Sequence, residues 1–248
     1  MKKRITVAYY LLLAFVLSCA SALVQAQYIQ AAFLDLGSNT LSEGLALRPS
    51  FTGGYFYEDY YANTGLQFTF SKEERKAVSA YFLSGGKYFR IQDSYLSGGL
   101  FFLLNPYSDL TREMNFGAMF TYGWKHVDLN LGYNVRLYTL DPDNLSGQSF
   151  GDDADLRIWE YRNIMYRGVL RLKENDSPWN AYIALTNFDS FLIQQETNPM
   201  LYGGGNFRLK ESLQLFAEIW YQGAGMLNLS SNYFGYYVRT GIVWRFVK

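Results

Sequence analysis

The chain has 248 residues, of which 22 are basic, 22 are acidic and one is a cysteine, Cys19. This balance excludes the strongly basic class of nucleic-acid-binding proteins, and one cysteine excludes an internal disulfide and a thiolate metal cluster. Aromatic residues make up 19% of the chain, with 22 tyrosines and 19 phenylalanines. So many aromatic side chains suit a protein that exposes them to lipid, and no metal or cofactor is expected.

The first 26 residues are typical of a secretory signal peptide. A basic start at Lys2 precedes an apolar run over 5–17, and small residues lead to Ala26. We expect cleavage after Ala26, which leaves one mature domain over 27–248. The leader holds three basic residues and no acid, so the mature chain has 19 basic and 22 acidic residues, a net charge of −3. A retained membrane anchor and lipid attachment at Cys19 are the alternatives.

Apolar and polar residues alternate along the mature chain, which indicates β-strands. In 126–139, for example, Val127 and Leu129 alternate with Asp128 and Asn130. Twelve such runs are expected, over 28–36, 44–56, 60–71, 76–90, 94–104, 113–124, 126–139, 157–172, 179–188, 200–209, 212–222 and 233–246. Many reach the ten residues that a tilted strand needs to cross a bilayer. The sequence therefore predicts an all-β protein, a single antiparallel up-and-down transmembrane barrel of about 12 strands.

The lengths of the connections support this topology. Membrane barrels have short periplasmic turns and longer external loops. The tight connections are expected at the periplasmic end, and the longer ones, over 105–112, 141–156, 189–199 and 223–232, at the external end. This parity requires a strand before residue 44. A ten-strand barrel with a periplasmic N-terminal arm and a soluble all-β sandwich or lipocalin-like barrel are the alternatives.

The last expected strand carries the most specific motif. Residues 239–246 read Arg-Thr-Gly-Ile-Val-Trp-Arg-Phe, which resembles the β-signal of bacterial outer-membrane proteins. The defined positions of that signal are occupied by Arg239, Gly241, Trp244 and Phe246. The resemblance implies an outer-membrane β-barrel surrounded by outer-membrane lipid and assembled by the barrel-assembly machinery. Two further residues, Val247 and Lys248, follow the terminal aromatic, which departs from the usual pattern.

The charged residues of the strands are expected to face the lumen, because charge on the lipid face is costly. The expected lumen residues are Arg48, Arg136, Arg167, Arg171, Arg208, Glu218, Arg239 and Arg245. Arginine-rich pores favour anions, so one interpretation is a channel with a basic lumen. Bulky inward residues such as Tyr202 and Trp220 favour the other, a lumen filled by side chains and salt bridges. Glu218 is expected to pair with Arg239 or Arg208.

Three hypotheses about function follow. The favoured one is a non-enzymatic barrel, either a small-solute channel or a structural or assembly component of the envelope. The alternatives are a lipid-modifying barrel enzyme and an accessory subunit that binds through its outer loops. An enzyme of that kind depends on His126, the single histidine, with Asp128 on the same strand face. His126 is expected in a periplasmic turn, so no catalytic residue is assigned.

Overall fold

A computed structural model of the chain describes residues 28–39, 42–70, 78–106, 111–140, 157–173, 177–194, 199–222 and 235–246. The regular structure in these ranges consists of β-strands. No helix in the described part of the chain is long and apolar enough to span a membrane. The expected signal peptide, Cys19 and the acidic connection 141–156 lie outside the described residues, so the expectations about them stay predictions.

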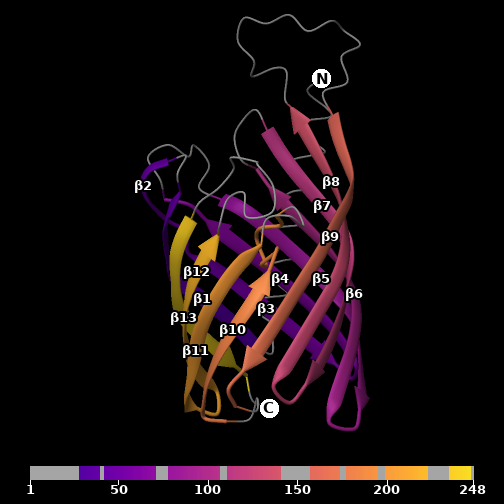
Figure 1. Cartoon of the computed structure of the whole chain (residues 1–248), viewed down its shortest axis with the longest axis vertical. Helices are drawn as coiled ribbons and strands as arrows, with labels where there is room; N and C mark the ends of the chain where they lie inside the picture. Colours follow the sequence, from indigo (N-terminus) through magenta and orange to yellow (C-terminus); the bar gives the residue numbers. More distant parts are fainter. Residues whose placement is uncertain are drawn as a thin grey trace, which may run out of the picture.

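The described strands form one antiparallel sheet that closes on itself (Figure 1). In chain order they are β1 (Tyr28–Asn39), β2 (Ser42–Leu47), β3 (Ser50–Tyr57), β4 (Tyr60–Phe68), β5 (Val78–Ile91), β6 (Ser94–Asn105), β7 (Thr111–Trp124), β8 (Val127–Leu140), β9 (Arg157–Arg171), β10 (Trp179–Thr186), β11 (Met200–Lys210), β12 (Leu213–Gln222) and β13 (Gly235–Arg245). Closure comes from the pairing of β13 with β1.

Two of these elements, β2 and β3, together occupy one position in the barrel wall. β3 pairs with the start of β1 and β2 pairs with its end. Pro49 lies between them and has no backbone N–H to give to a ladder, but its carbonyl still accepts a hydrogen bond from the Phe68 amide at 2.9 Å. The wall therefore has twelve strands, and the predicted fold class and strand count are confirmed.

The tight turns lie at the end of the barrel where the chain terminates (Figure 1). Two-residue loops join β3 to β4, β5 to β6 and β7 to β8. Their first residues, Glu58, Gln92 and Lys125, have positive φ values of 52°, 53° and 20°. Such values are what a tight hairpin between right-twisted strands requires. The predicted short-turn end is thus confirmed.

The two faces of the wall differ as the alternation predicted. On β8, Leu129 and Leu131 are 52% and 61% exposed on the outer face, whereas Asn134 on the inner face is fully buried. Large exposed aromatic residues collect on the outer face near the turn end: Tyr57, Tyr60, Phe89, Trp124, Trp179, Phe207 and Trp244. Aromatic girdles of this kind mark the membrane interface of outer-membrane barrels.

The seam between β13 and β1 explains the glycine of the terminal motif. Gly241 lies opposite Ala32, next to a register shift in β1 between Ala32 and Leu34. A Cβ atom on Gly241 would lie 2.0 Å from the Ala31 carbonyl oxygen. Only a residue without a side chain therefore lets the first and last strands approach closely at this point.

Candidate functional site

The described residues that follow β10 turn into the barrel. We name residues 187–194 the inward loop. β10 ends at Thr186, where the hydroxyl accepts a hydrogen bond from the Phe188 amide at 3.1 Å. The strand predicted over 179–188 is therefore two residues too long, because side-chain hydrogen bonds replace the ladder at its end. The connection from β10 to β11 joins strands at the end expected to be external, but the described loop bends inward from there.

The inward loop is held in a compact turn by its own hydrogen bonds. Phe188 and Ile193 form an antiparallel bridge. The Asp189 amide donates to the Leu192 carbonyl at 2.8 Å, and the Asp189 carboxylate accepts from the Phe191 amide at 2.6 Å. Residues 188–193 thus form a compact tip that lies in the lumen.

The apolar side of the tip packs against the inner face of the wall. Phe188, Phe191 and Ile193 are each no more than 6% exposed. They form one buried cluster with lumen residues of β5, β6 and β9, namely Ala80, Phe101, Leu103 and Met165. The space inside this part of the barrel is therefore filled by side chains.

Polar contacts anchor the same loop to three other parts of the wall. Arg239 of β13 donates to the Asp189 carboxylate at 2.9 Å, with both side chains at most 10% exposed. Arg136 of β8 donates to the Ile193 carbonyl at 2.6 Å. Asn187 donates to the backbone of β9 at the Ile164 carbonyl, 2.7 Å away. The inward loop therefore bridges strands on different sides of the barrel.

Arg136 is also the centre of a buried polar network. Its guanidinium lies 3.4 Å from Glu113 and 3.2 Å from Glu160. Asn115 accepts hydrogen bonds from Arg136 at 3.0 Å and from Asn134 at 2.8 Å. A network in which the charges are paired and hydrogen-bonded can be buried without a large penalty. This network fills the lumen where the inward loop contacts Arg136.

Nearer the turn end, the lumen is lined by polar side chains that are less deeply buried. Arg171 forms an ion pair with Asp128, which also accepts a hydrogen bond from Tyr95 at 3.1 Å. Glu218 accepts from Tyr182 at 2.6 Å and from Trp220 at 2.9 Å. Five lumen residues here are half-buried, namely Thr121, Asn130, Arg167, Arg171 and Glu218. We call this group of lumen residues the vestibule.

A stack of aromatic rings lines the lumen beside the vestibule. The ring centroids of Tyr202 and Trp220 are 3.9 Å apart, and those of Trp220 and Tyr237 are 5.3 Å apart. Arg167 lies over Tyr202 and Arg239 over Trp220, each 5.3 Å from the ring centroid. Two of the expected lumen arginines therefore lie over aromatic rings.

The remaining expected lumen residues, Arg48, Arg208 and Arg245, are less central to the contacts described above. Arg48 lies between β2 and β3, outside both strands, and is half-buried. Arg208 is half-buried near the turn end. Arg245 is exposed at the end of β13, 3.5 Å from Gln214. The charged contacts of the described lumen therefore centre on Arg136, Arg167, Arg171 and Arg239.

The acidic partners of these arginines differ from the expected ones. The expected bridge from Glu218 was to Arg239 or Arg208, but the hydrogen bonds given above join Glu218 to Tyr182 and Trp220. The ion pair of Arg239 is with Asp189, which the sequence placed in an external connection. Glu113 could have been found from its alternation with Asn115. Glu160 could not, because the register shift between β8 and β9 changes the parity of that strand.

His126 lies in the turn before β8, and its carbonyl accepts a hydrogen bond from the Arg171 amide at 2.8 Å. Asp128 is engaged by Arg171 and Tyr95, as described above. No cluster of metal-binding side chains occurs in the part of the chain that the structure describes. The geometry therefore gives His126 no acidic partner for catalysis among the described contacts.

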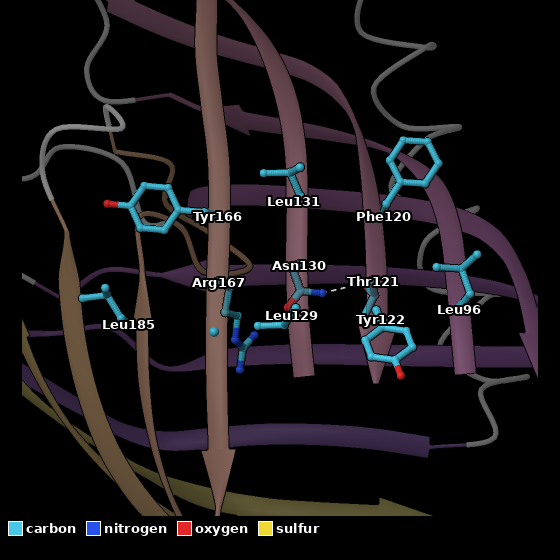
Figure 2. A pocket seen from close by; sticks show the side chains of 11 residues that line it. Leu96, Phe120, Thr121, Tyr122, Leu129, Asn130, Leu131, Tyr166, Arg167 and Leu185 are labelled. Atoms are coloured by element: carbon cyan, nitrogen blue, oxygen red, sulfur yellow. Dashed lines mark hydrogen bonds between the residues drawn. The ribbon is translucent and has the colours of Figure 1, made fainter. Parts of the chain in front are cut away.

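A hollow on the outer wall lies over β6 to β10, between side chains that include Phe120, Leu131 and Leu185. Figure 2 shows these residues on neighbouring strands, together with the hydrogen bond from Asn130 to Thr121. Its side chains are mostly those of the apolar outer face. This hollow is therefore part of the lipid-facing surface, and its lining also includes Thr121, Asn130 and Arg167 of the wall.

No protein-family model and no curated protein matches the chain. Among solved structures, a KdgM porin in complex with disordered oligogalacturonate aligns with 88% of this chain and 99% of its own, at a TM-score of 0.54 and 6% identity. The NanC porin aligns with 87% of this chain and 99% of its own, at a TM-score of 0.52 and 8% identity. The chain has the fold of a bacterial outer-membrane β-barrel protein. At these identities the comparison of this barrel with the two porins shows the fold alone.

Proposed function

We propose that this outer-membrane barrel is a non-enzymatic channel for small solutes, and that the inward loop holds it closed in the described conformation. The observation that carries the proposal is the position of the loop, which spans the lumen from β5 and β6 to β13. A loop in this position obstructs a path along the barrel axis. Its withdrawal would connect the vestibule with the opposite end.

The composition of the vestibule supports a channel over a purely structural barrel. A barrel that needs only rigidity gains most from a lumen packed to the density of a protein core. Here the half-buried Thr121, Asn130 and Arg171 give the vestibule a wall that water can wet. The two similar structures are porins by their printed names, which agrees with the proposal.

The contacts that hold the loop are of a kind that can open. The tip, residues 188–193, has one ion pair, a few hydrogen bonds and one apolar cluster. The ladder to β9 ends before it, where the Asn187 amide donates to the Tyr166 carbonyl at 3.1 Å. Elements with few such contacts open at much lower free energy than the whole fold. The wall, by contrast, is bonded strand to strand around its whole circumference.

Electrical recording from the refolded protein in planar bilayers tests this function. The variant needed replaces 188–193 with a Gly-Ser segment of the same length, and the control replaces the exposed turn residues 92–93 in the same way. We expect brief, infrequent conductance steps from the wild type and the control, and long-lived steps from the loop variant. Absence of steps from all three proteins would contradict the channel and favour a structural or assembly role.

We further propose that the protein reaches the outer membrane after cleavage behind Ala26, and that the barrel-assembly machinery recognises the strand that ends in Phe246. The exposed outer face and its aromatic girdle support this location. Mass spectrometry of the protein from fractionated envelopes tests the cleavage and the location. A mature N-terminus at Gln27 in the outer-membrane fraction is expected, and an uncleaved chain in the inner membrane would contradict the proposal.

A further inference from the structure

Arg167 differs from the three lumen arginines that form ion pairs in the described part of the chain. No ion pair of Arg167 occurs among the residues that the structure describes, whereas Arg136, Arg171 and Arg239 each have one. Its Nε atom is buried and has no hydrogen-bond partner. A buried guanidinium donor without an acceptor is costly, so this position calls for a ligand that accepts hydrogen bonds.

Two further buried donors near Arg167 are also without partners. They are the Tyr202 hydroxyl and the Nη1 atom of Arg171. Tyr202 packs against the Arg167 guanidinium, as described above, and Arg171 lies four residues along β9 on the same face. These three groups can all donate a hydrogen bond, and none has a partner among the described residues.

The neighbouring carboxylates do not fill this role. Asp128 accepts from Arg171 and Tyr95, and Glu218 accepts from Tyr182 and Trp220. Both carboxylates thus accept hydrogen bonds from groups other than Arg167. Their charges also limit the ligand, because an oxyanion with two negative charges is repelled more strongly than one with a single charge.

We propose that Arg167, Arg171 and Tyr202 form a binding site in the vestibule for the carboxylate of a small solute. A carboxylate has two acceptor oxygens for the guanidinium groups and the tyrosine hydroxyl. Its single negative charge suits a site that already contains Asp128 and Glu218. The biological role of this site, selecting a permeating solute, rests on the proposed channel function, but binding itself requires no conduction.

Trp220 provides a reporter for this site. It is 3% exposed and stacked on Tyr202, whereas Trp124, Trp159, Trp179 and Trp244 are 44–51% exposed on the outer wall. In vesicles of brominated phosphatidylcholine, lipid quenches the four outer tryptophans and leaves the fluorescence of Trp220. A ligand beside Tyr202 then changes the remaining signal.

The experiment is a titration of the refolded protein in such vesicles with acetate, with acetamide as an uncharged analogue of similar shape and with inorganic phosphate. We expect a saturable change with acetate, none with acetamide and a higher half-saturating concentration with phosphate. Arg167→Met should raise the half-saturating acetate concentration at least about tenfold, because a charge-assisted pair is lost. The control Arg208→Met, nearer the turn end, should leave it unchanged.

Tyr202→Phe keeps the ring and removes only the hydroxyl, so it tests the site even if Arg167→Met does not fold. It should weaken acetate binding about threefold, in line with the loss of one hydrogen bond. Absence of saturation with acetate, unchanged binding in the folded variants, or tighter binding of phosphate than of acetate would each overturn the carboxylate site. If acetate does not bind but conductance steps persist, the site is wrong and the channel stands.

Discussion

The carboxylate of Asp189 lies 2.9 Å from the guanidinium of Arg239 and joins the inward loop to the last strand of the barrel. Both side chains are nearly buried. The pair connects a loop that the sequence placed outside the barrel with a strand whose Tyr236 and Trp244 are exposed on the outer face. Removing one partner of a buried ion pair is strongly destabilising, because the other charge is left unpaired.

Asp189→Asn should therefore release the inward loop more often. We expect an increase of about tenfold or more in the fraction of time that single channels are open, since each tenfold change in an equilibrium needs only about 1.4 kcal/mol. The matched control is Asp93→Asn. Asp93 pairs with Lys125 at 3.6 Å but is largely exposed, and exposed pairs contribute little. Equal open fractions in both variants and the wild type would contradict the role of Asp189.

Gly241→Ala should weaken the seam between β1 and β13. The new Cβ would lie 2.0 Å from the Ala31 carbonyl oxygen, so the two strands must separate. We expect a lower yield of heat-modifiable, folded barrel on gels and a lower unfolding temperature. The control is Gly203→Ala on β11, where the nearest atom to the new Cβ is 3.7 Å away. If Gly241→Ala has no larger effect on folded yield and unfolding temperature than Gly203→Ala, close approach of β1 and β13 is not required.

Gln92→Gly should stabilise the turn between β5 and β6. Gln92 has a φ of 53°, which costs a residue with a side chain roughly 1–2 kcal/mol. Glycine avoids this cost but loses about 0.5–1 kcal/mol through its greater freedom in the unfolded chain. A net gain of about 0.5–1 kcal/mol in the free energy of unfolding is expected in urea titrations. The neighbouring Asp93→Gly, without positive φ to relieve, should lower stability instead.

Leu131→Lys and Asn130→Lys test which face of β8 contacts lipid. Leu131 is 61% exposed on the outer wall, where a lysine near the bilayer midplane costs about 2–4 kcal/mol. Asn130 faces the vestibule, where a lysine stays in polar surroundings. We expect a marked loss of folding free energy in lipid vesicles only for Leu131→Lys. A larger loss for Asn130→Lys would reverse the assignment of the two faces.

The wall of the barrel was largely predictable from the sequence, because a period of two and the parity of the connections depend only on local alternation. The terminal motif added the direction of the last strand. The break at Pro49 was not predicted. The strands on both sides of it pair with β1, and the alternation of apolar and polar residues runs on through Pro49 without a visible interruption. Similarly, the end of β10 depends on hydrogen bonds from Asn187 and Thr186 that only the folded barrel supplies.

The lumen was predictable only in part. Alternation placed Arg136, Arg171 and Arg239 on the face opposite to lipid, but it gave no information on their partners. Asp189 belongs to a connection without periodicity, so no sequence signal indicated that it turns inward. The register shift in β9 likewise concealed Glu160. Contacts across the lumen are long-range, and a pattern along one strand cannot specify them.

The most direct test of the closed-channel account fixes the inward loop to the wall. The mature chain has no cysteine, so Asp189→Cys with Arg239→Cys introduces a unique pair of thiols at the contact described above. A short bifunctional thiol reagent with a reducible link can join them during recording in a planar bilayer. The account predicts that the unlinked double variant opens readily, that linking abolishes its conductance steps, and that a reductant restores them. Conductance that is unchanged after the link is verified by mass spectrometry would contradict closure by the inward loop.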